Sequence, residues 1–185
     1  DRIGQVPVSI TYCPLCNSGI VFDRRIKNHV LSFGVSGMLR RSDMIMYDHQ
    51  TESWWQQFTG EAVVGELTGI TLKMLPSQII SYDQFKAVAP NGLVLSRDTG
   101  YQRDYGTNPY EGYDDPNGSP FRYRGPVDLR LKPMARVIGV RQAKHAVAYA
   151  HAITSTAMVV HDQLGTTPIA VFHLPGAVSA LDQSL

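Results

Sequence analysis

Short apolar runs separated by turn residues constrain the fold of this chain more than any other sequence feature. Runs at residues 19–23, 29–35 and 43–47 are only a few residues long, and a polar turn at Lys27-Asn28 separates the first two. Such runs are typical of β-strands joined as hairpins. Strands do not alternate with long helical patterns, so a doubly wound parallel sheet is not expected. We therefore predict a mainly β or α+β fold of antiparallel hairpins, with one or two short helices.

The remaining elements follow from similar patterns. Further strands are expected at residues 61–67, 71–75, 93–96, 136–140 and 157–160. One helix is expected at residues 82–88, where Ser81 is the N-cap and Gln84 completes a capping box. A long ordered loop is expected at residues 99–125, which are rich in Gly, Pro, Asp and Asn. Residues 145–156 are rich in alanine and fit either a short helix or a strand with a turn.

A repeated pattern connects the two ends of the chain. Residues 1–23 begin with D-x-I-G-x-x-P-V-x-I, and residues 162–182 begin with D-x-L-G-x-x-P-I-x-V. In each segment a turn with glycine and proline precedes an apolar strand, which predicts two copies of one β unit. Only the first copy carries Cys13 and Cys16, so the fold of the β unit does not require cysteines, and we interpret the pair as a functional site. We expect a single domain over residues 1–185, and a natural precursor with an upstream segment that this chain lacks.

Cys13 and Cys16 are the only cysteines of the chain and form a C-x-x-C motif. This spacing can close a redox-active disulfide or direct two thiolates at one metal ion. A purely structural disulfide is less expected, because a disulfide stabilises a fold more when it closes a long loop. For redox chemistry, Arg40 or Arg41 would stabilise the thiolate. Arg41 and Asp43 are expected to share a strand face, where they could pair.

A metal site would need ligands in addition to the two thiolates. His173 is the preferred third ligand, because it aligns with Tyr12, beside the cysteine loop, in the other copy of the repeat. Met44 and Met46 offer thioethers that suit Cu(I), although core packing is the expected role of both. The metal would be copper or zinc, whereas thiol redox chemistry requires no cofactor. The residues alone leave both alternatives open.

The composition bears on the partners of the chain. Its 17 basic and 16 acidic side chains are mixed along the sequence, and no basic run predicts binding to nucleic acid. No apolar stretch approaches the roughly 18 residues that span a bilayer, so a transmembrane helix is not expected. Of Trp54 and Trp55, one is expected to anchor the core while its neighbour points the other way. A large exposed aromatic side chain would indicate a partner surface.

Several runs together carry a resemblance to a known family. They are VSITYCPLC at residues 8–16, FDRR at 22–25, SFGVSG at 32–37, RSDxxMYD at 41–48, QTESxWQQ at 50–57 and YGxNPYxGY at 105–113. In this combination the chain resembles, over essentially its whole length, the uncharacterised bacterial and archaeal family called domain of unknown function 3179. The resemblance implies an exported or envelope-associated protein. Some members are similar enough to be described as selenoproteins with selenocysteine within the C-x-x-C motif, which favours redox chemistry here.

The chain departs from this family in two places. Members usually carry an upstream segment that ends in a run like WHEIVND, and Asp1 would be its last residue. The resemblance therefore leads us to expect that this chain lacks the N-terminal segment of the family. In the segment that leads into the second copy of the repeat, a run like AYPL in the family reads AYAH at residues 148–151, which ends at His151.

These observations predict an exported domain with a thiol redox site formed by Cys13, Cys16 and Arg41. One thiolate would attack a disulfide or a peroxide, and the other would resolve the intermediate, with a protein as a possible redox partner. A first alternative is a metal-binding module without enzymatic activity, with Cys13, Cys16 and His173 as ligands. A second alternative is a structural or assembly subunit of a larger envelope complex, in which a partner chain fills an unpaired sheet edge.

Overall fold

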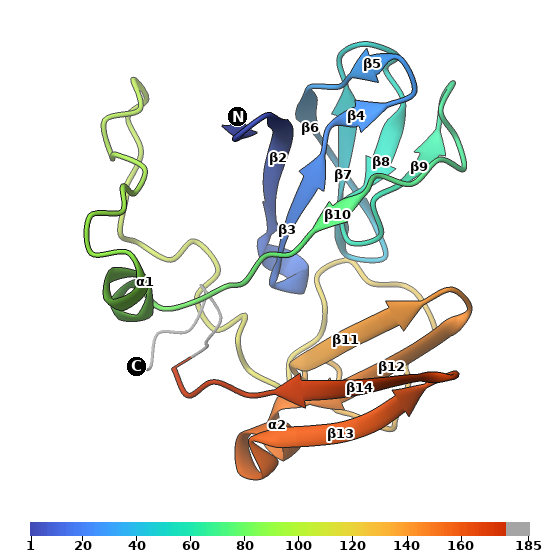
Figure 1. The fold of residues 1–185 in the computed structure, drawn as a ribbon, viewed down its shortest axis with the longest axis vertical. Coiled ribbons are helices and arrows are strands. Elements are labelled where there is room, and N and C mark those ends of the chain that lie inside the picture. The colour runs from blue at the N-terminus through green and yellow to red at the C-terminus, as the bar shows by residue number, and fades with distance from the viewer. Residues whose placement is uncertain (177–185) are drawn as a thin grey trace. The chain divides into compact units, whose positions relative to one another are not determined.

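The computed structural model describes residues 1–176, which form two compact units (Figure 1). The first unit comprises Asp1–Ile79 and Ser119–Pro126, and the second comprises Ile80–Gly118 and the chain from Val127 onward. Antiparallel strands make up most of the regular structure, and the helices are short, as predicted. The single domain that we expect over residues 1–185 stays a prediction.

The first sheet of the first unit carries the cysteine motif. Its strands are β1 (Arg2–Ile3), β2 (Val6–Cys13), β3 (Ser18–Asp23) and β10 (Met74–Leu75), in the order β1-β2-β3-β10. Strands β2 and β3 pair antiparallel along their length, and the last pair joins Cys13 to Ser18. A single turn of 3-10 helix, η1 (Pro14–Cys16), connects them. The motif therefore occupies the end of a hairpin, with Cys13 on the strand and Cys16 in the connection.

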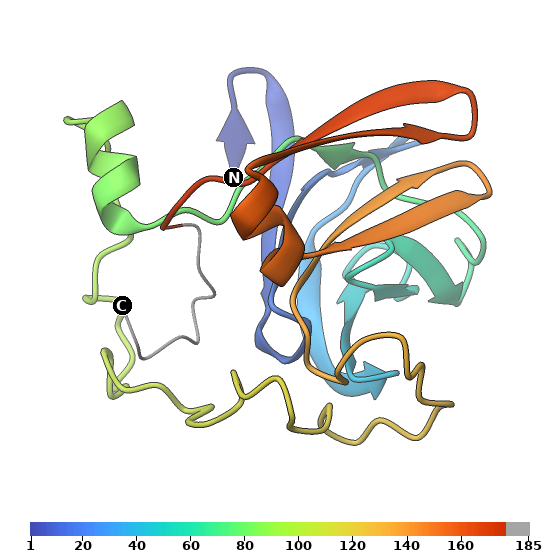
Figure 2. The same cartoon turned by 90° about the horizontal axis from the view of Figure 1, so that it is seen from below.

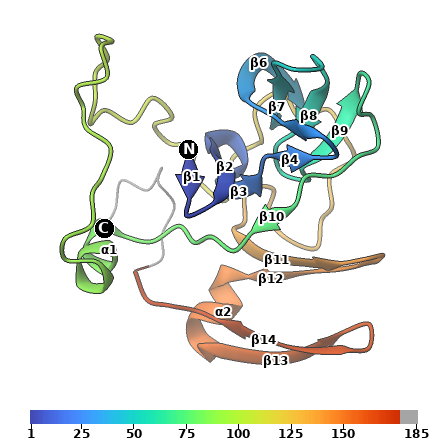
Figure 3. The ribbon, with the colours of Figure 1, turned by 45° about the horizontal axis from the view of Figure 1, so that its top comes forward.

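A second four-stranded sheet completes the first unit (Figure 3). Its strands are β6 (Phe33–Arg40), β7 (Asp43–Asp48), β8 (Trp54–Gln56) and β9 (Glu61–Val64), in the order β6-β7-β8-β9. A small hairpin, β4 (Arg25–Ile26) with β5 (His29–Val30), turns at Lys27-Asn28 as predicted. The hairpin that enters β7 turns at Arg41-Ser42, where both residues have positive φ angles, as in a type I′ turn.

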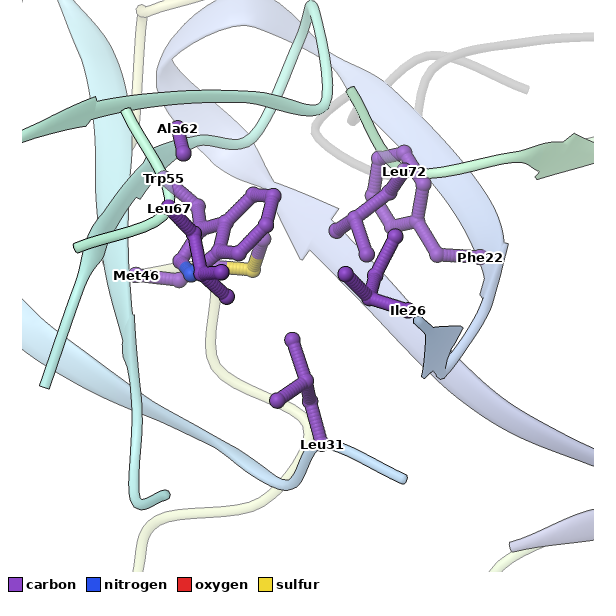
Figure 4. Packing of buried hydrophobic residues seen from close by; sticks show 8 residues of the cluster. All are labelled: Phe22, Ile26, Leu31, Met46, Trp55, Ala62, Leu67 and Leu72. Atoms are coloured by element: carbon purple, nitrogen blue, oxygen red, sulfur yellow. The ribbon is translucent and has the colours of Figure 1, made fainter. Parts of the chain in front are cut away.

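The core of the first unit gathers apolar side chains from both sheets and the segments between them (Figure 4). It consists of Phe22, Ile26, Leu31, Met46, Trp55, Ala62, Leu67 and Leu72. Burial of each large apolar side chain contributes about 1.5–3 kcal/mol of stabilisation. Met46 belongs to this core and Met44 packs against it, which confirms the expected packing role of both residues. Trp55 is buried whereas Trp54 is 38% exposed, so the predicted division between the tryptophans is also confirmed.

The second unit contains two short helices and two hairpins (Figure 2). Its elements are α1 (Tyr82–Val88), β11 (Val137–Gln142), β12 (His145–Ala150), α2 (His151–Ala157), β13 (Val159–Leu164) and β14 (Thr167–Phe172). Strand β11 pairs with β12, β13 pairs with β14, and α2 links the two hairpins. Within residues 1–176, no helix has both the length and the apolar character needed to cross a membrane.

The predicted helix and several predicted strands occur, with some corrections. Ser81 and Gln84 form the expected capping box, since each side chain bonds the backbone of the other residue. Residues 145–156 form both a strand and a helix. The strand expected at 61–67 already ends at Val64, and the one at 71–75 shortens to Met74–Leu75.

The strand expected at residues 93–96 is wrong. Leu93 and Leu95 are 94% and 98% exposed, and the segment pairs with no other strand among the described residues. A strand needs a neighbour for its N–H and C=O groups, and an apolar run does not supply one.

The two copies of the predicted repeat share the geometry of their turns. The pairs flanking the turns are Arg2 with Pro7 and Ile3 with Val6 in the first copy, and Gln163 with Pro168 and Leu164 with Thr167 in the second. Gly4 and Gly165 occupy the same turn position, with φ angles of 58° and 63° that favour glycine. The second copy extends to residue 182, beyond the described residues, so the repeat as a whole stays a prediction.

Candidate thiol site

The loop between β2 and β3 holds the two cysteines close to each other. Pro14 suits the first turn of a helix, where its missing N–H group is not needed. Asn17 ends η1 with a φ angle of 47°, and its N–H donates to the Pro14 carbonyl at 3.3 Å. Both thiols are free. Cys13 is only 1% exposed, whereas Cys16 is half-buried, so Cys16 is the more accessible thiol.

Asp43, the first residue of β7, brings a carboxylate to the thiols from the second sheet. Cys16 Sγ donates to Asp43 Oδ1 at 3.2 Å, and the Phe58 N–H donates to Asp43 Oδ2 at 2.9 Å. One ligand atom from each of Cys13, Cys16 and Asp43 lies within 4.8 Å of the other two. The site therefore combines two sulfur atoms with a buried carboxylate whose second oxygen is fixed by the backbone.

A buried polar network supports Cys16 from the other side. Ser18 Oγ lies 3.2 Å from Cys16 Sγ and donates to Gln57 Oε1 at 2.8 Å. Gln57 is fully buried, and its Nε2 donates to Thr11 Oγ1 at 2.9 Å and to the Ser18 carbonyl at 3.1 Å. A buried amide with these partners satisfied has little freedom to rotate. Gln57 therefore fixes Ser18, and Ser18 in turn limits where the Cys16 sulfur can lie.

The two thiols differ in how readily they lose a proton. The hydrogen bond from Cys16 is the main cause that lowers the pKa of Cys13 from 9.0 to about 7, and backbone hydrogen bonds from Met44 and Cys16 add to it. Burial and the charge of Asp43 act in the opposite direction. The pKa of Cys16 is raised, first by its hydrogen bond to Cys13, which competes with Asp43 for the one S–H proton, then by burial and the nearby negative charges. Near neutral pH the pair thus favours a Cys13 thiolate beside a protonated Cys16.

Arg41 and Arg40 lie at the turn between β6 and β7. Arg41 is exposed and forms no hydrogen bond or ion pair with any residue that the structure describes. Arg40 donates through Nη1 to Gln56 Oε1. The expected pairing of Arg41 with Asp43 does not occur, because the Asp43 oxygens accept hydrogen bonds from Cys16 and Phe58 instead. The catalytic role of Arg41 stays a prediction.

His173 lies in the second unit, whereas Cys13 and Cys16 lie in the first. Its ring packs edge to face against His151 with centroids 5.6 Å apart, and its Nδ1 lies 3.3 Å from Thr154 Oγ1. A role of His173 as a metal ligand stays a prediction.

Sequence reasoning did not identify Asp43 as a member of the site. It expected Asp43 to pair with Arg41 on one strand face, in an Arg-Arg-x-Asp cluster that could line a polar pocket or bind an anionic substrate, and did not connect it with the cysteines. The one available signal was its place in the run RSDxxMYD at residues 41–48, which is one of the runs that carry the family resemblance.

Comparisons with known proteins give the chain a family but no activity. Neither the curated proteins nor the solved structures provide a match. A family model described as "Protein of unknown function (DUF3179)" matches residues 1–185, the whole chain. The resemblance carried by the cysteine motif and its companion runs is thereby confirmed, and the chain belongs to the DUF3179 family.

Proposed function

We propose that this protein is a thiol oxidoreductase that exchanges disulfides through Cys16 and Cys13. The observation that carries the proposal is the grouping of two free thiols and the Asp43 carboxylate within 4.8 Å. Disulfide exchange requires an accessible thiol, a second thiol beside it, and a route for the proton of the attacking group. The three side chains match these three requirements.

The exposure and the protonation of the two thiols assign their roles in the exchange. Cys16 is the attacking thiol, because Cys13 is too deeply buried to meet a disulfide of another molecule. Asp43 Oδ1 accepts the S–H hydrogen bond of Cys16, so it can relay this proton towards the leaving thiolate as the Cys16 sulfur attacks. Cys13 is the resolving thiolate, because its lowered pKa of about 7 keeps much of it deprotonated near neutral pH.

The reaction then has two steps. The Cys16 sulfur attacks one sulfur of the substrate disulfide and forms a mixed disulfide with it. The substrate S–S bond breaks, and the other substrate sulfur leaves as the first thiolate. Cys13 attacks Cys16 Sγ, the mixed disulfide breaks, and the second substrate thiolate leaves. The substrate gains two electrons and the protein becomes the Cys13–Cys16 disulfide. One of the two protons taken up by the product thiols comes from Cys16 by way of Asp43, and the other comes from solvent.

The export implied by the family resemblance is part of this proposal. Disulfides persist in oxidising compartments outside the cytoplasm, so an exported protein would meet disulfide substrates there. The substrate would be a protein disulfide or a small one.

The decisive experiment measures the midpoint potential of the Cys13–Cys16 pair, by alkylation and mass spectrometry across a dithiothreitol redox series. A reversible transition between about −120 and −270 mV, the range of thiol oxidoreductases, is expected. A disulfide that stays closed below about −300 mV would identify a structural bond instead. Since the chain has no other cysteine, the double variant Cys13→Ser/Cys16→Ser supplies a clean blank for the alkylation signal.

A second candidate function is metal binding, and the same three ligand atoms favour it. Two thiolates and one carboxylate leave a fourth position open, as in catalytic zinc sites, and thiolates also suit Cu(I). Retention of zinc or copper through gel filtration, with loss in Asp43→Ala and in the double cysteine variant, would support this function. Thiols that become alkylated only after a chelator is added would favour it over disulfide exchange.

A further inference from the structure

A surface cleft lies on the second sheet, at the end of β7 opposite to Asp43. Its volume is about 350 Å³, and it is lined by Val35, Ser36, Tyr47, His49, Glu52 and Trp54. Sites for small molecules typically occupy about 300–1,000 Å³. At about 3.3 Å per strand residue, Tyr47 lies on the order of 13 Å along β7 from Asp43. The cleft is therefore a feature separate from the thiol site.

The sheet holds the aromatic walls of this cleft in place. Tyr47 pairs with Trp54 across β7 and β8, and with Gly34 across β6 and β7. A Cβ atom at Gly34 would lie 2.6 Å from Tyr47 Cζ, so the tyrosine ring occupies space that only glycine leaves open. The ring also packs edge to face on His49, with centroids 5.0 Å apart.

The turn that presents His49 and Glu52 is held by a buried residue. Asp48 Oδ1 accepts hydrogen bonds from the backbone N–H of Gln50 at 3.1 Å and of Thr51 at 2.6 Å. The Asp48 carbonyl accepts the Glu52 N–H at 3.0 Å, which keeps Glu52 at a φ angle of 55°. The carboxylate of Glu52 is thus carried on a turn that is ordered before any ligand arrives.

Several polar groups of the cleft are available to a ligand, although the Ser36 hydroxyl donates to the Ile45 carbonyl. The Tyr47 hydroxyl, the Glu52 carboxylate and the Trp54 indole N–H form no hydrogen bond with any residue between 1 and 176. By contrast, the indole N–H of Trp55 donates to Asp48 Oδ2 at 2.9 Å within the core, so it is not available to a ligand. Neither lysine nor arginine lines the cleft, so Glu52 makes its fixed charge negative.

We propose that this cleft binds a small organic cation of the alkylammonium class. Aromatic rings attract a cation through their π electrons, and Trp54 and Tyr47 line the cleft together with Glu52, whose carboxylate supplies the opposite charge. Val35, which is largely exposed, offers an apolar contact for the alkyl groups of such an ion. A neutral molecule would gain nothing from the charge, and an anion would be repelled by it.

The test uses choline and its neutral carbon analogue, 3,3-dimethylbutan-1-ol, which have nearly the same shape. Titration of isotope-labelled protein is followed through the two indole N–H signals in NMR spectra. Choline should shift the Trp54 signal saturably and leave the Trp55 signal in place, which also shows that the core stays folded. Cation–π attraction of about 0.5–2 kcal/mol corresponds to a roughly 2- to 30-fold preference for choline over the neutral analogue.

Variants decide which side chains carry the binding. Glu52→Gln keeps the shape of the side chain and should weaken choline binding by a similar factor, whereas Glu66→Gln, an exposed glutamate outside the cleft, should leave it unchanged. The double variant Cys13→Ser/Cys16→Ser should bind choline like the parent protein. Equal affinity for the neutral analogue, an unsaturable shift, or full binding by Glu52→Gln would overturn the proposal.

Discussion

The thiol of Cys16 donates a hydrogen bond to the carboxylate of Asp43 at 3.2 Å, although 27 positions separate the two residues in the chain. The contact joins the loop after β2 to the first residue of β7, and so connects the two sheets of the first unit. A carboxylate placed beside a thiol disfavours the thiolate by its charge and accepts the S–H hydrogen bond at the same time. Cys16 is therefore protonated at rest but has its proton acceptor in contact.

Replacement of Cys16 tests how the Cys13 thiolate is stabilised. The hydrogen bond from Cys16 is the largest cause of the low Cys13 pKa. Cys16→Ala removes this donor, so the pKa of Cys13 should rise from about 7 towards or above 9.0, the ordinary value. Thiolate absorbance in the ultraviolet, followed against pH, measures the change. Cys13→Ala serves as the control, because the transition near pH 7 should disappear in it altogether; an unchanged transition in Cys16→Ala would show that another donor stabilises the thiolate.

Neutralisation of Asp43 should move the same titration in the opposite direction. The charge of Asp43 raises the pKa of both Cys13 and Cys16. In Asp43→Asn that repulsion is lost, so the thiolate transition should begin at a lower pH than in the parent protein. Asp23→Asn is the matched control, because the Asp23 carboxylate pairs with Arg25 and should leave the thiol titration unchanged. A higher transition in Asp43→Asn would mean that its carboxylate does not act on the thiols through its charge.

Local signals explain which elements could be predicted from the sequence. The capping box of α1 involves Ser81 and Gln84 only, and the β4–β5 hairpin depends on the Lys27-Asn28 turn. Each of these elements is decided within a few residues. The exposed run at 93–96 has a strand-like composition as well, but whether a strand forms depends on a partner elsewhere in the fold.

The candidate site could likewise be predicted only where its residues lie close together in the sequence. Cys13 and Cys16 could be selected because the motif lies within one loop. Asp43 could not be assigned to them, because its approach depends on how two sheets pack across the core. Arg41, selected for its charge, is exposed in the turn before Asp43, and the hydrogen bonds that lower the Cys13 pKa come from Cys16 and Met44.

A double-mutant cycle tests the buried pair of Asp48 and Trp55. Asp48 Oδ2 accepts the hydrogen bond of Trp55 Nε1 at 2.9 Å, and both side chains are fully buried. Asp48→Ala leaves the indole N–H without an acceptor, which should lower the free energy of unfolding by at least about 1–3 kcal/mol. Trp55→Phe should be destabilising too, but the two effects should not add, with a coupling energy of about 0.5–3 kcal/mol. Urea unfolding of the four proteins provides the values, and strict additivity would show that the hydrogen bond contributes nothing.

The same aspartate should make folding sensitive to acid. Burial raises the pKa of Asp48, but hydrogen bonds from Trp55 and from Gln50 and Thr51 outweigh it, so the pKa in the folded protein lies below the ordinary value of 3.8. A group with a lowered pKa in the folded state stabilises the fold above its unfolded pKa, and this contribution is lost as the pH falls through the folded value. The free energy of unfolding of the parent protein should therefore fall as the pH is lowered below about 3.8. In Asp48→Asn this part of the slope should be absent, whereas Asp83→Asn, at an exposed position of α1, should retain it. Urea titrations across that pH range measure the slope, and equal slopes in the parent and Asp48→Asn would show that Asp48 titrates alike in the folded and unfolded chains.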